Sequence, residues 1–321
     1  MTETIARAIA GVRRVAVIGA GTIGASWAAS FLARGLDVIA SDPAPEGEAF
    51  LRRYVAAAWP VLARLGLAPD ASPDRLAFTG DPLAAAAGAD FVQESGPERE
   101  DAKIALFRQL DGVLAPDAVL ASSSSGLLIS RLQQGCRHPG RCIIGHPFNP
   151  PHLIPLVEVV GGAQTAPAAI ARAMAFYAGI GKKPIHIRKE VAGHLANRLQ
   201  AALWREAVHL VAEGVADVAD VDAAIAYGPG LRWAIMGPHL TFHLAGGVGG
   251  IEHFMDHLAV PLQGWWRDLG DPALTPELQQ KIVDGVAAEA AGRSIPELAA
   301  ERDRILLKVL EAVRDKDMGK G

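Results

Sequence analysis

Cysteine is scarce in this chain of 321 residues, no long hydrophobic run is present, and neither sign of charge is in large excess. With two cysteines, Cys136 and Cys142, we expect reduced thiols in a cytoplasmic protein and not a disulfide framework. No apolar run reaches the ~18 residues that cross a bilayer, and the N-terminal stretch lacks the apolar core of a signal peptide. The net charge of −4 gives no indication of nucleic acid or a membrane surface as a partner.

The chain is rich in hydrophobic residues, at 50%, and its length allows two domains with a substantial core. In the first half, short apolar runs alternate with helix-length segments, which predicts an α/β domain with a doubly wound, mostly parallel sheet. From Val191 onward the pattern is helical, beginning with a long helix over 192–215. We therefore predict an α/β domain over residues 1–188 and an all-α domain over 189–321. The expected strands lie within 13–20, 36–42, 75–80, 89–95, 117–125, 141–146, 154–162 and 183–190.

A glycine-rich turn follows the first expected strand. Residues 19–24 read G-A-G-T-I-G, which fits G-x-G-x-x-G and opens a predicted helix. Asp42 ends the second strand, where it would hydrogen-bond the adenosine ribose, and Pro43 and Ala44 offer no cation for a 2′-phosphate. The pattern therefore favours a Rossmann-type domain over a glycine turn with no ligand, and it favours NAD over NADP as the cofactor. The expected cofactor-binding residues are Gly19, Gly21, Thr22, Ile23, Gly24, Asp42 and Glu98.

One carboxylate interrupts an apolar stretch. Residues 153–160 are apolar except for Glu158, and a buried carboxylate is costly unless it is paired. His146 ends the preceding strand, at the carboxyl edge of the sheet where ligands bind in such folds. The serine run 122–125 ends an earlier strand at the same edge and supplies hydroxyls. A catalytic His–Glu pair and two unrelated polar residues fit this pattern about equally well.

These segments resemble the 3-hydroxyacyl-CoA dehydrogenase superfamily over nearly the whole chain. The resemblance is carried by the glycine turn and by "SSSSGL", "GHPFNPPHLIPLVEVV" and "EVAGHLANRLQ". It implies an NAD-dependent dehydrogenase in which a His–Glu pair transfers the proton while a Ser and an Asn hold the substrate oxygen. These roles fall on His146, Glu158, Ser125 and Asn197, with Ser124 left open as the alternative serine.

The second half is similar to a branch of the superfamily that acts on free 3-hydroxy acids. The similarity lies in "GPGLRWAIMGPHLTFHLAGG" and "IEHFMDHL", where Arg232 could clamp a substrate carboxylate. Residues 46–75 contain no lysine, which weakens the case for a CoA substrate. The resemblance implies oxidation of L-carnitine to 3-dehydrocarnitine. The alternatives are L-gulonate, a short-chain 3-hydroxyacyl-CoA, and a non-catalytic protein like a lens crystallin, against which the complete Ser–His–Glu–Asn set argues.

Aromatic residues are the expected partners of a quaternary ammonium group, which cannot donate a hydrogen bond. Our candidates for this wall are Trp233, Phe148 and Phe242, although aromatics at helical spacing are more often core or interface residues. The Trp-rich helices over 189–321 are also too apolar for one small domain. We therefore expect this domain to bind substrate and to form a homodimer.

Histidine pairs at helical spacing raise the question of a metal. His239 and His243, and likewise His253 and His257, are four residues apart. Neither pair has the Glu of H-E-x-x-H, and hydride transfer needs no metal when NAD carries the hydride. We expect no metal.

Overall fold

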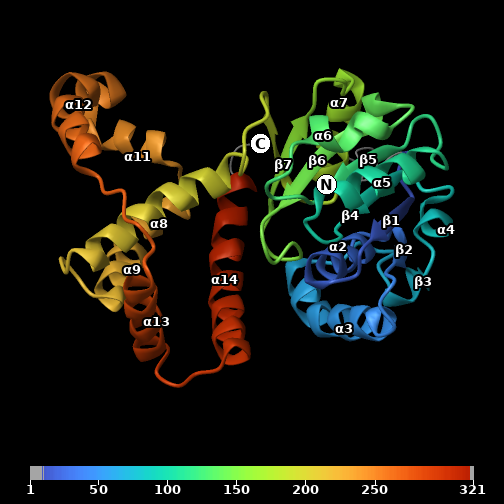
Figure 1. Cartoon of the computed structure of the whole chain (residues 1–321), viewed down its shortest axis with the longest axis horizontal. Helices are drawn as coiled ribbons and strands as arrows, with labels where there is room; N and C mark the ends of the chain where they lie inside the picture. Colours follow the sequence, from blue (N-terminus) through green and yellow to red (C-terminus); the bar gives the residue numbers. More distant parts are fainter. Residues whose placement is uncertain (1–8, 10, 319–321) are drawn as a thin grey trace. The chain divides into compact units, whose positions relative to one another are not determined.

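The computed structural model describes residue 9 and residues 11–318 (Figure 1). The chain divides into two compact units, Met1–Arg198 and Leu199–Gly321. Unit 1 extends past the boundary that we placed at residue 188, because residues 194–196 hydrogen-bond back to the end of the sheet. Among the residues described, no helix has the length and apolar character needed to cross a membrane.

An eight-stranded sheet forms the centre of unit 1, in the order β3-β2-β1-β4-β5-β6-β7-β8 (Figure 1). Every expected strand is present, and all neighbouring pairs are parallel except β6 and β7. The prediction of a Rossmann-type, mostly parallel sheet is confirmed. The strands are β1 (Arg14–Ile18), β2 (Asp37–Ser41), β3 (Leu76–Thr79), β4 (Phe91–Glu94), β5 (Val119–Ser122), β6 (Cys142–Pro147), β7 (Leu156–Gly161) and β8 (Lys183–Ile187).

Helices cover both faces of this sheet, as a doubly wound fold requires. Along β1, Val15 and Val17 face one buried cluster while Ala16 and Ile18 face the other. The first cluster includes side chains of α2 (Thr22–Leu32), α3 (Gly47–Leu65) and α7 (Pro167–Gly179). The second includes α4 (Pro82–Ala86), α5 (Glu100–Asp111) and α6 (Ile129–Leu132). Short 3-10 turns are η1 (Pro73–Arg75), η2 (Gln133–Gly135) and η3 (Pro139–Arg141).

The β6–β7 pair turns back on itself. A parallel crossover needs about a dozen residues or more, and the connection over 148–155 is shorter than that. The two strands therefore run antiparallel, and His146 lies directly opposite Glu158. Two residues that are twelve apart in sequence thus share one face of the sheet.

Unit 2 is entirely helical in its described part, which confirms the prediction of an all-α second domain. The long helix that we expected over 192–215 begins at Ala196 instead, because Gly193 and His194 have φ angles of 72° and 51°. The helices are α8 (Ala196–Ala212), which starts in unit 1, and then α9 (Val218–Tyr227), α10 (Pro229–Trp233), α11 (Pro238–Ala245), η4 (Gly247–Gly249), α12 (Gly250–Asp268), α13 (Pro276–Ala290) and α14 (Ile295–Met318).

Candidate active site

The glycine turn between β1 and α2 has the shape of a dinucleotide site. A Cβ on Gly24 would lie 1.8 Å from the carbonyl oxygen of Gly19, and a Cβ on Gly19 would lie 2.7 Å from the carbonyl carbon of Ser95. A Cβ on Gly21 would meet nothing within 4 Å. No side chain caps α2 at Gly21, so the amides of its first turn, at Thr22 and the following residues, can bind a pyrophosphate. The residues present therefore fit a bound dinucleotide.

Asp42 lies beside this turn, at the end of β2. Its Oδ2 accepts a hydrogen bond from the Ala20 amide at 2.7 Å, and its Oδ1 accepts one from the Ala44 amide at 2.9 Å. The carboxylate is half-buried and held by the backbone, at the position of the acceptor for ribose hydroxyls in such folds. Thr22 and Ile23 form the start of α2.

Glu98 holds the serine turn at the end of β5. Its Oε1 accepts hydrogen bonds from the Ser124 hydroxyl at 2.5 Å and from the amides of Ser125 and Gly126, both at 3.0 Å. The buried Ser124 hydroxyl thus donates its one hydrogen bond to Glu98, and its oxygen accepts a hydrogen bond from the Leu127 amide. Ser125 is exposed, and among the residues described its hydroxyl makes no hydrogen bond to the protein. This difference favours Ser125 as the hydroxyl that is open to a substrate.

A buried ion pair supports the same turn, and sequence reasoning missed it. The Lys103 ammonium lies 2.6 Å and 2.7 Å from the two carboxylate oxygens of Glu94, and the Ser122 hydroxyl donates to Glu94 at 2.6 Å. The Lys103 Nζ is also 3.9 Å from Glu98 Oε2. Glu94 follows Gln93 at the end of β4, so it does not interrupt an apolar run as Glu158 does, and local pattern did not indicate it.

His146 and Glu158 are joined by a short hydrogen bond. The Nδ1 of His146 is 2.7 Å from Oε2 of Glu158, and the two residues are 6% and 0% exposed. The other carboxylate oxygen of Glu158 accepts the backbone amides of Leu195 and Ala196, at 2.9 Å and 2.8 Å. The buried carboxylate therefore has the partners that its burial demands.

Electrostatics fix the direction of this hydrogen bond. Burial raises the pKa of Glu158, but the hydrogen bond to His146 and the two backbone amides outweigh it and leave the pKa below its ordinary value of 4.5. An ionised carboxylate can only accept, so His146 carries a proton on Nδ1. In the neutral imidazole, Nε2 then has the free lone pair.

The segment before α8 completes this edge of the sheet. His194 is 2% exposed, and its Nε2 donates to the Ser124 carbonyl oxygen at 2.9 Å. Its ring centroid is 5.1 Å from that of His146. Burial lowers the pKa of His194 below its ordinary value; the hydrogen bond to the Ser124 carbonyl opposes this shift, and His146 assists it. Asn197 follows in the first turn of α8, directly after the amide of Ala196 that binds Glu158.

The predicted substrate contacts belong to both units. In unit 1, Phe148 lies edge-on to His146, with ring centroids 5.7 Å apart. In unit 2, Arg232 and the half-exposed Trp233 end the short helix α10. Phe242 does not pair with Trp233 but stacks on Phe254, at 4.7 Å between centroids. Within the described part of the chain, no group of three or more His, Cys, Asp or Glu is arranged to hold a metal.

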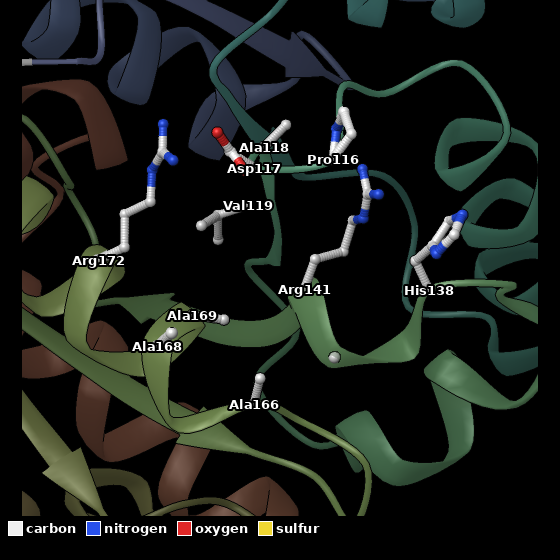
Figure 2. Close-up of a pocket in the computed structure, with 11 residues that line it drawn as sticks. Pro116, Asp117, Ala118, Val119, His138, Arg141, Ala166, Ala168, Ala169 and Arg172 are labelled. Carbon is white, nitrogen blue, oxygen red and sulfur yellow. The ribbon is translucent and has the colours of Figure 1, made fainter.

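A cavity of about 460 Å³ lies elsewhere on unit 1 (Figure 2). Its walls include Val119 at the start of β5, Arg141 just before β6, and Arg172 of α7. Parallel strands start at the edge of the sheet opposite to the one where they end, and His146 and the serine turn mark the ends of β6 and β5. This cavity is therefore separate from the candidate active site.

A dinucleotide turn together with a buried His–Glu pair at the carboxyl edge of the sheet defines a nicotinamide-dependent dehydrogenase. Residues 14–191 match the model of the 3-hydroxyacyl-CoA dehydrogenase NAD binding domain, and residues 193–287 match that of the C-terminal domain. The chain belongs to the 3-hydroxyacyl-CoA dehydrogenase family, and it is an NAD-dependent 3-hydroxy acid dehydrogenase.

Two curated relatives show how far the similarity extends. An L-carnitine dehydrogenase of Streptomyces griseus is 55% identical over 301 residues, covering 94% of this chain and 90% of the relative. An L-carnitine dehydrogenase of Pseudomonas putida is 48% identical over 310 residues, covering 97% of each chain.

A solved structure shares both domains. The NAD⁺-dependent dismutase 5-formyl-3-hydroxy-2-methylpyridine 4-carboxylic acid 5-dehydrogenase matches with a TM-score of 0.80 at 33% sequence identity. The match covers 94% of this chain and 99% of that chain.

Proposed function

We propose that this enzyme oxidises L-carnitine to 3-dehydrocarnitine with NAD. The observation that carries this choice of substrate is the identity of 47–55% to curated L-carnitine dehydrogenases over nearly the whole chain. A free acid and a thioester would need different partners in the substrate site, and Arg232 and Trp233 are our candidates for those of a free acid.

In this proposal His146 is the general base. NAD, when bound, supplies the acceptor for the hydride that leaves C3 of the substrate. The free Nε2 lone pair of His146 takes the hydroxyl proton, and the Glu158 carboxylate stabilises the imidazolium that forms. The Ser125 hydroxyl and the Asn197 amide hold the substrate oxygen and polarise the ketone in the reverse direction. Two hydrogen bonds support these assignments. The Ser124 hydroxyl already donates to Glu98, which leaves Ser125 for the substrate, and His146 is hydrogen-bonded to Glu158.

The two ends of carnitine call for two kinds of partner. The Arg232 guanidinium would bind the carboxylate through charge-assisted hydrogen bonds. Aromatic faces would bind the trimethylammonium at about 0.5–2 kcal/mol per contact, and Trp233, Phe148 and Phe242 are the candidates. Holding both ends would fix which face of C3 meets the nicotinamide.

We also propose that the enzyme is a homodimer through its helical unit. Large apolar side chains remain exposed there, including Trp265 at 64% and Trp266 at 66%, while Val208, Val211 and Phe254 are among the few that are buried in the part described. An apolar surface of this kind on a folded domain marks an interaction site. A second copy of the same unit would cover it, as in most soluble oligomers.

The test of the proposed substrate is a panel of initial rates. NADH formation would be measured with L-carnitine, L-gulonate, 3-hydroxybutyrate and 3-hydroxybutyryl-CoA at equal concentrations. We expect L-carnitine to have the highest kcat/KM. If gulonate is oxidised faster than carnitine, the proposed aromatic contacts to the trimethylammonium are wrong, but the proposed role of Arg232 stands. If the CoA ester is preferred over the free acids, both proposals are wrong.

Two variants separate the contacts within that panel. Arg232→Met should raise KM for carnitine strongly, because the carboxylate loses a charge-assisted partner. Trp233→Leu should instead narrow the preference for carnitine over 3-hydroxybutyrate, which has no cation. Arg302→Met on the exposed side of α14 is the matched control and should leave both values unchanged. Equal effects of Arg232→Met and Arg302→Met would contradict the clamp.

A further inference from the structure

Two thiols that the proposed mechanism does not use meet at the start of β6. The Sγ atoms of Cys136 and Cys142 are 3.7 Å apart, and both cysteines are free. Cys136 is half-buried after η2, whereas Cys142 is buried as the first residue of β6. The pair is separated from His146 by the length of the strand, about 13 Å at ~3.3 Å per residue.

A buried carboxylate closes the turn between these cysteines. Asp111 is 2% exposed, and its Oδ2 accepts the amides of Arg137 at 2.6 Å and His138 at 3.0 Å. Its Oδ1 lies 3.3 Å from Nε of Arg141, whose side chain is 7% exposed. Asp111 thus contacts three residues of the turn, at 137, 138 and 141, and these contacts hold the segment between the two cysteines in place.

The two sulfurs are chemically unequal. The hydrogen bond that the Cys142 thiol donates lowers the pKa of Cys136 below its ordinary value of 9.0. Burial and the charge of Asp111 oppose this shift, whereas the charges of Arg141 and Arg108 assist it. As the donor and as a buried group, Cys142 has a raised pKa. Cys136 is thus the more acidic of the two thiols and the one that reacts first as a thiolate, while Cys142 is the thiol held against it.

The cavity described above borders the turn between the two cysteines, which do not line it themselves, and Cys136 is partly exposed. His138, Gly140 and Arg141 of the turn line it, together with Pro116 and the start of α7 at Ala168 (Figure 2). Its volume of about 460 Å³ admits a small oxidant with ease. A reagent of that size can approach the turn without opening the sheet.

We propose that Cys136 and Cys142 form an oxidation site for small hydroperoxides, separate from the active site. The Cys136 thiolate attacks the peroxide; an S–O bond forms, the O–O bond breaks, and hydroxide or alkoxide leaves and takes up a proton. The Cys142 sulfur then attacks the sulfenic acid; an S–S bond forms, the S–O bond breaks, and water leaves with the Cys142 proton. The peroxide is reduced by two electrons, and the two thiols are oxidised to one disulfide.

The geometry allows this step with a modest movement. A disulfide needs about 2.05 Å between the sulfurs, so the half-buried Cys136 must approach Cys142 by roughly 1.7 Å. This approach falls on the half-buried side chain of Cys136, which lies outside the sheet, whereas Cys142 is the first residue of β6. The catalytic residues lie at the other end of β6, so removing either thiol should leave NADH formation unchanged.

Hydrogen peroxide and peptide mass mapping test the proposal on the full-length enzyme. Arg137 and Arg141 separate the two cysteines, so trypsin places them on different peptides. After peroxide treatment we expect these peptides to be linked, with the loss of two hydrogen atoms and full reversal by dithiothreitol. The absence of the linked peptide at peroxide levels that oxidise Cys136 would overturn the proposal.

Two variants assign the roles of the sulfurs. Cys142→Ala should stop at a Cys136 sulfenic acid that dimedone traps, and Cys136→Ala should leave Cys142 unmodified. If Cys142 is oxidised at the same rate without Cys136, the order of attack is wrong and the proposal fails. NADH formation by both reduced variants is the folding control, and it should match wild type within about twofold.

Discussion

At the scale of single residues, the carboxylate in the apolar run has the partner that the sequence demanded. Glu158 binds His146 with one oxygen and the start of α8 with the other. The sequence could indicate that such a carboxylate needs partners, because burial has a known cost. It could not indicate Leu195 and Ala196 as those partners, since a backbone amide has no residue-specific signal.

The choice between the serines was also beyond the sequence. Four consecutive serines look alike as letters, and what distinguishes them is the hydrogen bond from Ser124 to Glu98, which lies 26 residues earlier in the chain. The same applies to the buried pair of Lys103 and Glu94, whose members lie on different elements. Long-range contacts of this kind follow from the fold and not from local pattern.

The first prediction at this scale concerns the cofactor. Asp42→Ala should weaken NAD binding and narrow the gap to NADP, because the ribose acceptor and its repulsion of a 2′-phosphate disappear together. Titration of both dinucleotides by the quenching of protein fluorescence gives the two Kd values. Wild-type enzyme that binds NADP as tightly as NAD would contradict the role given to Asp42.

The second prediction concerns the pH dependence of stability. The folded-state pKa of Glu158 lies below its ordinary value of 4.5, so its ionised form stabilises the fold above that pH, and this contribution is lost as pH falls through the folded pKa. Glu158→Gln should therefore lower the free energy of unfolding by about 1–3 kcal/mol at neutral pH. Urea unfolding between pH 7 and pH 3 should show the two proteins converging on the acid side. A constant difference across that range would contradict the assignment.

At the scale of secondary-structure elements, the pattern of apolar runs in the sequence was sufficient to predict the strands of the sheet. All eight strands coincide with the apolar runs of the sequence, with β6 reaching one residue further to Pro147, because strands buried in a parallel sheet are mostly apolar. The reversal at β7 was not predicted, since strand direction depends on the connecting segment and not on the strand. The late start of α8 was not predicted either, because the left-handed conformation of His194 at φ 51° runs against the residue's own preference.

The third prediction separates two glycines in the turn between β1 and α2. Gly24→Ala places a methyl group 1.8 Å from the Gly19 carbonyl and should cost about 1–3 kcal/mol of stability. Gly21→Ala meets nothing in the protein and should keep its stability, yet it should weaken NAD binding because the methyl group occupies the approach to α2. Thermal unfolding and NAD titration of both variants check this contrast. If both variants bind NAD as tightly as wild type, the turn does not bind the pyrophosphate.

At the scale of the whole molecule, the fourth prediction is the assembly. Sedimentation velocity at micromolar concentration should give a mass twice the 33.6 kDa of the chain. Replacing Trp265 and Trp266 together by Lys should shift the enzyme to the monomer, because two cations would be placed in an apolar interface. A wild-type monomer at that concentration would reject the proposed interface.

The central claim for the whole enzyme is that His146 removes the hydroxyl proton while hydride passes to NAD. The measurement that tests it most directly is single-turnover NADH formation from L-carnitine with wild type and His146→Gln. His186→Gln, on the exposed side of β8, serves as the control. We expect His146→Gln to slow this step by at least about 10²–10⁴-fold while NADH binding stays within a few-fold of wild type, and the control to be unaffected. A rate in His146→Gln within tenfold of wild type would contradict the account.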